Sequence, residues 1–167
     1  MHALRRDQPG DLARTVPHPV FSLGLSDLTT APVLEAARPT GWRYLLRQGD
    51  RVVASAETVT MPAGRQEFAQ INCGPFVAST AAALETADAL PETMDRSYEP
   101  RLLDVPALHT MALWLHGDRK DDLLIPLDPA PEGIEPNRAY PADELLGILA
   151  DKASQVPTLD PRDPRGG

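Results

Sequence analysis

The chain has 167 residues and a formal net charge of −8 at pH 7. That length suffices for one domain with a buried core. The negative charge repels phosphate groups, so it argues against binding to nucleic acids and to anionic membrane surfaces. No apolar run approaches the roughly 20 residues that cross a bilayer, and the N-terminus lacks the apolar segment of a signal peptide. Because Cys73 is the single cysteine, nothing indicates an oxidising compartment, and we expect a cytoplasmic protein.

Both ends of the chain are polar and punctuated by proline. We therefore predict a disordered arm over residues 1–19, a single α+β domain over residues 20–154 and a disordered tail over residues 155–167. Within the domain, Thr30–Arg38 is predicted to form a short helix, with Thr30 as its cap and a proline in its first turn. The basic residues are almost all arginine, and alanine, proline and aspartate are abundant, which is typical of a bacterium with a GC-rich genome.

The first hairpin is the clearest local pattern in the chain. Trp42–Gln48 and Arg51–Thr60 are rich in strand-forming residues and flank a two-residue turn that contains glycine. Alternation along the first strand puts Trp42 and Tyr44 on one face and Arg43 on the other. One face is thus apolar and the other mixed, which is typical of a sheet covered by helices on one side.

A helix is predicted to begin at Pro75, because proline is favoured at the first helical position. Two apolar runs, Ala107–Leu115 and Leu123–Leu127, then predict a second hairpin of buried strands. The polar turn between them, Gly117–Asp122, holds charges of both signs and is interpreted as a solvated loop. A last helix is predicted to begin near Tyr140, where a proline and two carboxylates follow.

The predicted order of elements is β-β-α-β-β-α, preceded by the short helix. The most economical arrangement for this order is an α+β fold with a mostly antiparallel four-stranded sheet, helices on one face, and flexible N- and C-terminal tails. An edge strand from either hairpin has backbone groups that are free to pair with another chain. A homodimer through an edge strand is therefore one expectation from the sequence.

Cys73 is the candidate nucleophile, because it lies just before the helix that begins at Pro75. The N-terminus of a helix stabilises a thiolate. The base would be a histidine, and His109 and His116 are the two histidines within the predicted hairpin. The alternative is a small buried cysteine at a junction between a loop and a helix. No flanking signature of a known cysteine hydrolase accompanies Cys73.

The sequence predicts no metal site and no cofactor. His109 and His116 lie seven residues apart, and an odd separation along a continuous strand points two side chains to opposite faces. The chain has no second cysteine and no pair of histidines at helical spacing that could complete a metal site. Its glycines form neither a dinucleotide-binding nor a phosphate-binding motif.

Trp42, Tyr44 and Trp114 are the candidate binding residues. Large aromatic side chains line a partner or ligand surface where a sheet face is open, and otherwise belong to the core. We assign Trp114 to the core and keep both roles for Trp42.

A good core without a catalytic motif favours a non-enzymatic binding or protein-interaction domain over an enzyme. Such a domain would use the open sheet face or the groove between the helices and the second hairpin, and its negative charge suits a basic protein partner. Two alternatives stay open. One is a small enzyme that uses Cys73 with His109 or His116. The other is a small-molecule binding domain with a pocket between the sheet and the helices.

Overall fold

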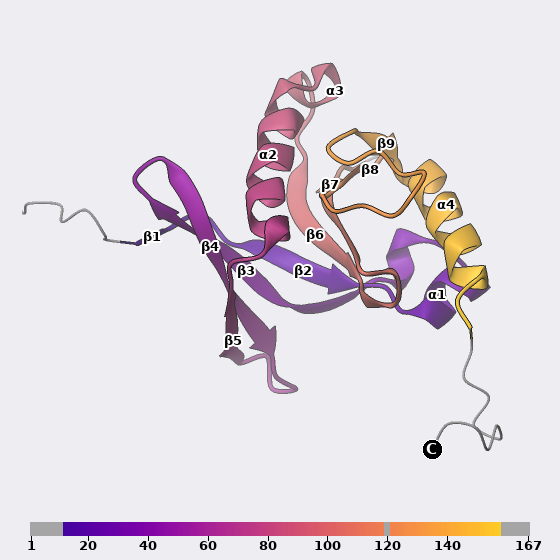
Figure 1. The fold of residues 1–167 in the computed structure, drawn as a ribbon, viewed down its shortest axis with the longest axis horizontal. Helices are drawn as coiled ribbons and strands as arrows, with labels where there is room; N and C mark the ends of the chain where they lie inside the picture. Colours follow the sequence, from indigo (N-terminus) through magenta and orange to yellow (C-terminus); the bar gives the residue numbers. More distant parts are fainter. Residues whose placement is uncertain (1–11, 119–120, 158–167) are drawn as a thin grey trace, which may run out of the picture.

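The structure is a computed structural model that describes residues 12–118 and 121–157. Within these residues, nine strands form one mixed sheet with the order β5-β4-β3-β2-β6-β7-β8-β9, and β1 pairs with β3 (Figure 1). The strands are β1 (Ala13–Arg14), β2 (His18–Ser22), β3 (Arg38–Gln48), β4 (Arg51–Thr60), β5 (Gln66–Asn72), β6 (Glu99–Val105), β7 (Thr110–His116), β8 (Leu123–Pro126) and β9 (Tyr140–Pro141). The helices are α1 (Leu25–Thr30), α2 (Pro75–Ala89), α3 (Pro91–Met94) and α4 (Ala142–Ser154), with the short 3₁₀ helices η1 (Leu34–Ala36) and η2 (Pro106–Leu108).

The prediction of a mostly antiparallel four-stranded sheet is wrong. Both predicted hairpins exist, as β3–β4 and β7–β8, but further strands join them into one larger sheet. The link is β2, which pairs antiparallel with β3 and parallel with β6. The local pattern missed β2 and β6 because both begin among prolines and polar residues, which are typical of loops.

The helices cover both faces of β6, β7 and β8, and not one face as the sequence predicted. Figure 1 shows α2 and α4 on either side of these strands. One apolar core lies under α2 and contains Leu102, Leu113 and Ile125. The other lies under α1 and α4 and contains Leu103, Trp114 and Leu124. Strands that are buried on both faces have continuous apolar sequences without alternation, which explains the apolar runs of β7 and β8.

Of the short helix predicted over Thr30–Arg38, only the three-residue 3₁₀ helix η1 is present, because α1 ends where that helix was expected to begin. The carboxylate of Asp27 accepts a hydrogen bond from the Gly24 backbone N–H at 2.8 Å, which starts the helix earlier in the chain. Pro32 disfavours a helical conformation in the residue before it, so α1 does not continue. The two longer helices lie where the sequence predicted them, beginning at Pro75 and Ala142.

The predicted arm and tail extend beyond the described part of the chain, because residues 1–11 and 158–167 lie outside it. Within the range assigned to the arm, β1 pairs with β3 and β2 begins at His18. The boundary predicted at residue 19 therefore falls inside β2. No helix in the described ranges combines the length and apolar character needed to cross a bilayer.

Leu113 and Leu124 test whether both faces of the sheet are covered, since each is fully buried in a different core. We expect Leu113→Ala and Leu124→Ala each to lower the free energy of unfolding by about 2–5 kcal/mol, because each leaves a cavity under a different helix. Urea denaturation measures both. Met94→Ala, at an exposed position, is the control and should change stability by no more than about 0.5 kcal/mol. A leucine variant that matches this control would show that one face is uncovered.

Candidate binding groove around His116 and Asp122

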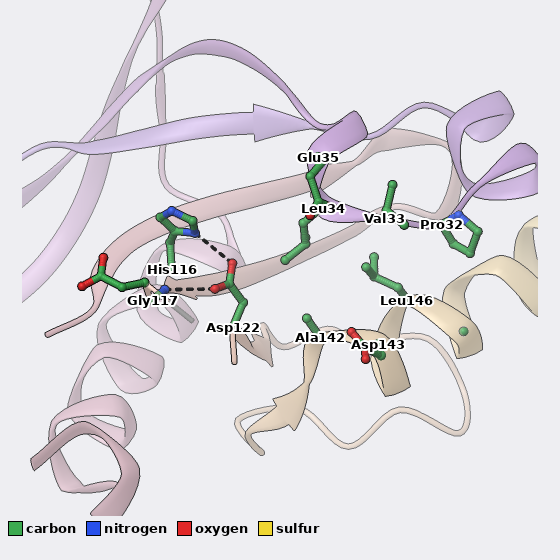
Figure 2. A pocket seen from close by; sticks show the side chains of 12 residues that line it. Pro32, Val33, Leu34, Glu35, His116, Gly117, Asp122, Ala142, Asp143 and Leu146 are labelled. Atoms are coloured by element: carbon green, nitrogen blue, oxygen red, sulfur yellow. Dashed lines mark hydrogen bonds and ion pairs between the residues drawn. The ribbon is translucent and has the colours of Figure 1, made fainter. Parts of the chain in front are cut away.

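The carboxylate of Asp122 accepts three hydrogen bonds from the end of β7. Trp114 Nε1 donates to Oδ2 at 2.6 Å, and His116 Nδ1 contacts the same oxygen at 2.9 Å. The backbone N–H of Gly117 donates to Oδ1 at 2.9 Å (Figure 2). This arrangement follows from the register of the hairpin. Leu115 pairs with Leu123, so the next residues toward the turn, His116 and Asp122, lie opposite each other.

Hydrogen bonds keep the pKa of the Asp122 carboxyl low. Burial acts to raise its pKa, but hydrogen bonds from His116, Gly117 and Trp114 outweigh burial and hold the pKa below its ordinary value of 3.8. An ionised carboxylate only accepts hydrogen bonds, so His116 Nδ1 carries a proton and Nε2 is the acceptor of the neutral ring. Asp122 is 11% exposed and His116 is 41% exposed. The carboxylate therefore orients the histidine, and the histidine is the group that a ligand can reach.

Two further features hold the hairpin loop in place. The backbone carbonyl of Asp122 accepts a hydrogen bond from the N–H of Ala142 at 3.0 Å, which ties the first residue of α4 to the hairpin. Gly117 makes the close approach possible, because a Cβ at this position would lie 2.9 Å from both the Tyr98 ring and the Asp121 carboxylate. Any other residue at position 117 would require the side chains of Tyr98 and Asp121 to move.

A cavity of about 740 Å³ lies between η1, the end of β7 and the first turns of α4 (Figure 2). Its apolar lining comes from the segment around η1 and from α4: Pro32, Val33, Leu34, Ala142 and Leu146. Carboxylates of Glu35, Asp118 and Asp143 also line it. A second cavity of about 260 Å³ shares Leu34, Glu35, His116 and Asp122 with the first, so the two form one continuous groove. We call the two cavities together the η1–α4 groove.

Arg101 packs over an edge-to-face pair of aromatic rings, Phe21 and Trp114, at the smaller end of the groove. Its guanidinium carbon lies 4.8 Å from the centroid of the Phe21 ring and 4.9 Å from that of the Trp114 ring. Arg101 Nη2 donates to Glu99 Oε2 at 2.9 Å, which neutralises its charge. Trp114 is therefore fixed by stacking on its face and by Asp122 at its nitrogen.

The three aromatic residues predicted to bind a partner or ligand lie in two different parts of the sheet: Trp114 on β7, and Trp42 and Tyr44 on β3. Trp114 is 4% exposed, which confirms its assignment to the core, and it also donates the hydrogen bond to Asp122 that the sequence did not predict. Trp42 and Tyr44 lie on β3, away from the groove, and Trp42 is 36% exposed. A binding role for Trp42 and Tyr44 stays a prediction.

The three residues of the predicted cysteine site lie at separate places in the sheet. Cys73 is exposed in the loop between β5 and α2. His109 follows η2 in a left-handed conformation just before β7, whereas His116 is the last residue of β7. Four strands lie between β5 and β7 in the sheet order. No hydrogen bond joins any two of Cys73, His109 and His116 in the described part of the chain, and only His116 lines the groove.

Asp122 was not predicted from the sequence, in which the polar turn Gly117–Asp122 is interpreted as a solvated loop. The signal that could have found it is the symmetry of the hairpin. His116 and Asp122 bracket a short turn between two strands, and residues at such positions lie opposite each other. Glu35 and Asp143 gave no such signal, because their place in the groove depends on how η1 and α4 pack together.

No protein-family model, curated protein or solved structure matches the chain. Within residues 12–118 and 121–157, no group of three or more histidine, cysteine, aspartate or glutamate side chains is arranged to hold a metal ion. The function of the groove therefore has to be inferred from its own geometry.

Asp122 should make the stability of the protein depend on pH. We expect Asp122→Asn to lower the free energy of unfolding at neutral pH by about 1–3 kcal/mol, because an amide cannot accept all three hydrogen bonds. Since the folded pKa of Asp122 lies below 3.8, its contribution is fully present above that pH and is lost as the pH falls through the folded pKa. Urea denaturation at neutral and acidic pH measures the difference between the wild type and the variant, which should shrink on acidification.

The neighbouring Asp118→Asn, at an exposed position of the same loop, is the matched control and should show little loss at either pH. A loss in Asp122→Asn that stays constant on acidification would contradict the role of the ionised carboxylate.

Because Cys73 is exposed, we expect the native protein to react completely with Ellman's reagent, at the rate of an unstructured cysteine peptide. Faster reaction needs a base, a cation or a helix N-terminus in contact with the thiol, and no hydrogen bond from α2 or from either histidine reaches Cys73 in the described part of the chain. Cys73→Ser is the blank for the assay. A rate clearly above that of the peptide, which His116→Ala returns to the peptide value, would instead support the enzyme hypothesis.

Proposed function

We propose that this chain is a protein-interaction domain that binds a basic segment of a partner protein in the η1–α4 groove. The observation that carries the proposal is the combination of an apolar lining and carboxylates in one cavity of about 740 Å³. A segment in which an aliphatic side chain stands beside a lysine or an arginine matches both properties.

The charges around the groove support a basic occupant. Glu35 and Asp143 are both exposed and come from different walls, η1 and α4. Of the described residues that line the larger cavity, none is lysine or arginine. The net charge of −8 adds attraction at longer range, which raises the rate of encounter with a basic partner.

His116 supplies the directional contact of the groove. Its Nδ1 is held by Asp122, so Nε2 is available to accept a hydrogen bond from a backbone amide or a lysine ammonium group. Because the ring is already fixed, binding to it loses little additional side-chain entropy. The apolar residues would then supply affinity by burial, and the histidine and the carboxylates would set the orientation of the segment.

The continuity of the two cavities favours an extended segment over a single side chain. They meet at Leu34, Glu35, His116 and Asp122, so a chain that fills the larger cavity can continue toward Arg101. The small-molecule alternative concerns the same groove, and the experiment below separates the two. A homodimer through an edge strand and a cytoplasmic location stay predictions from the sequence.

The proposal is tested by selecting peptides from a randomised heptapeptide library with the full chain as bait. We expect the selected peptides to combine an aliphatic residue with lysine or arginine. The consensus peptide is then synthesised, and its affinity is measured by fluorescence anisotropy. Glu35→Gln combined with Asp143→Asn should weaken binding by about tenfold or more, because two charge-assisted contacts are lost.

Glu85→Gln combined with Asp88→Asn makes the same change of charge on exposed positions of α2 and should leave the affinity unchanged. Selection of acidic or purely apolar peptides would contradict the proposal. Binding of butylammonium ion as tightly as the consensus peptide would identify the groove as a site for small amines instead.

A further inference from the structure

A second group of polar side chains lies under the first turn of α2. Strand pairing places Arg43 opposite Glu57, and Ser55 opposite Asn72. Paired residues share a face of the sheet, and the spacing along β4 puts both pairs on the same face. Together with Asp104 of β6 and the start of α2, they line a cavity of about 280 Å³. This cavity and the η1–α4 groove have no lining residue in common.

Arg43 is 7% exposed and is neutralised within the sheet. Its Nε donates to Glu57 Oε1 at 2.6 Å, and its Nη2 donates to the same oxygen. Gln70 Nε2 donates to Glu57 Oε2 at 2.9 Å. A buried charge is tolerated when it is paired and hydrogen-bonded in this way. The pair therefore gives the cavity polar atoms without a net charge.

Ser55 has no partner of this kind. It is fully buried, and its Oγ makes no hydrogen bond to any other described residue. Thr80 of α2 is buried to the same degree, but its hydroxyl donates to the backbone carbonyl of Phe76 at 2.5 Å. An unpaired hydroxyl in the interior is costly, and native proteins contain few of them. Ser55 lines the cavity, but its Oγ has almost no accessible surface, so a ligand in the cavity reaches this hydroxyl through a small shift of the wall.

The cavity has little net charge to offer a ligand. Arg43 and Glu57 neutralise each other. Burial raises the pKa of Asp104 above its ordinary value of 3.8, with Arg43 acting against this shift and Glu57 adding to it. The N-terminus of α2, at Gly74 and Phe76, adds a partial positive charge that opposes the carboxylate. An anionic ligand would lose its hydration here without an adequate counter-charge, and a cationic ligand would find only the Asp104 carboxylate, which the N-terminus of α2 partly offsets.

We propose that this cavity binds a small uncharged polyol of the size of a monosaccharide. Vicinal hydroxyls both donate and accept hydrogen bonds, which matches the unpaired hydroxyl of Ser55 and the polar side chains of Asn72 and Asp104. The Phe76 ring supplies an apolar wall for the C–H face of a sugar ring. The cavity volume of about 280 Å³ lies just below the roughly 300 Å³ at which small-molecule sites usually begin, so the cavity itself has room for a single sugar ring. The proposal does not depend on the function proposed for the η1–α4 groove.

The test uses the full chain labelled with ¹⁵N and a panel of neutral probes: glucose, galactose, mannose, ribose and myo-inositol. We expect at least one probe to shift the backbone amide signals of Phe76 and Val77 in a saturable way. Charge is then tested with glucosamine and glucuronate, which keep the ring of glucose and add one charge of either sign. Both should bind more weakly than the neutral probe by about tenfold or more.

Ser55→Ala separates a binding role from a structural one. Because it removes an unpaired hydroxyl, it should leave the melting temperature unchanged or higher while weakening binding by about tenfold. Asn72→Ala, at a half-buried position, should also weaken binding and tests the proposal even if Ser55→Ala does not fold. Ser26→Ala, an exposed serine of α1, is the matched control and should change neither quantity.

Several results would overturn the proposal. One is the absence of any shift at Phe76 and Val77 with all five neutral probes. A second is tighter binding of glucosamine or glucuronate than of every neutral probe. A third is a shift caused by a planar heterocycle such as uracil but by none of the polyols. A lower melting temperature in Ser55→Ala with unchanged affinity would assign the hydroxyl a structural role.

Discussion

The η1–α4 groove depends on one buried carboxylate. Asp122 accepts hydrogen bonds from Trp114, His116 and Gly117 through its side chain, and from Ala142 through its backbone carbonyl. It thereby joins the end of β7 to the start of α4. A buried acceptor with three donors is stable only as a complete set, because loss of the acceptor leaves every donor without a partner. The hairpin between β7 and β8 brings Asp122 next to His116, and the hydrogen bond between them therefore sets the position of the His116 ring.

The parts of the fold that the sequence predicted are those that depend on neighbouring residues. The two hairpins and the helices α2 and α4 have turn residues, prolines and apolar spacing close at hand. The parallel pairing of β2 with β6 has no such signal, because the partners are far apart in the chain. For the same reason the sequence indicated His116 and Trp114 but not the carboxylates of η1 and α4, which packing brings to them.

The β3–β4 hairpin shows why the sequence predicted helices on only one face of the sheet. Alternation in β3 gives an apolar face with Trp42 and a mixed face with Arg43, and burial of the apolar face would be the ordinary outcome. The structure instead buries part of each face, since Arg43 is buried at 7% exposure beside α2 and Leu46 is equally buried on the other face, while Trp42 keeps 36%. The exception is possible because Glu57 lies directly across the ladder and neutralises Arg43. A local rule that is broken and then compensated in this way is a mark of a functional site.

The two sites use charge in opposite ways, and this difference predicts the kind of ligand that each selects. Around the η1–α4 groove the carboxylates of Glu35 and Asp143 are exposed, so they act through solvent, are screened by salt and mainly favour encounter with a basic partner. Under α2 the charges of Arg43 and Glu57 cancel, so this pair contributes little attraction and instead penalises a ligand that brings an unmatched charge. A single sheet thus supports an exposed surface suited to recruitment and a polar, partly buried cavity suited to discrimination.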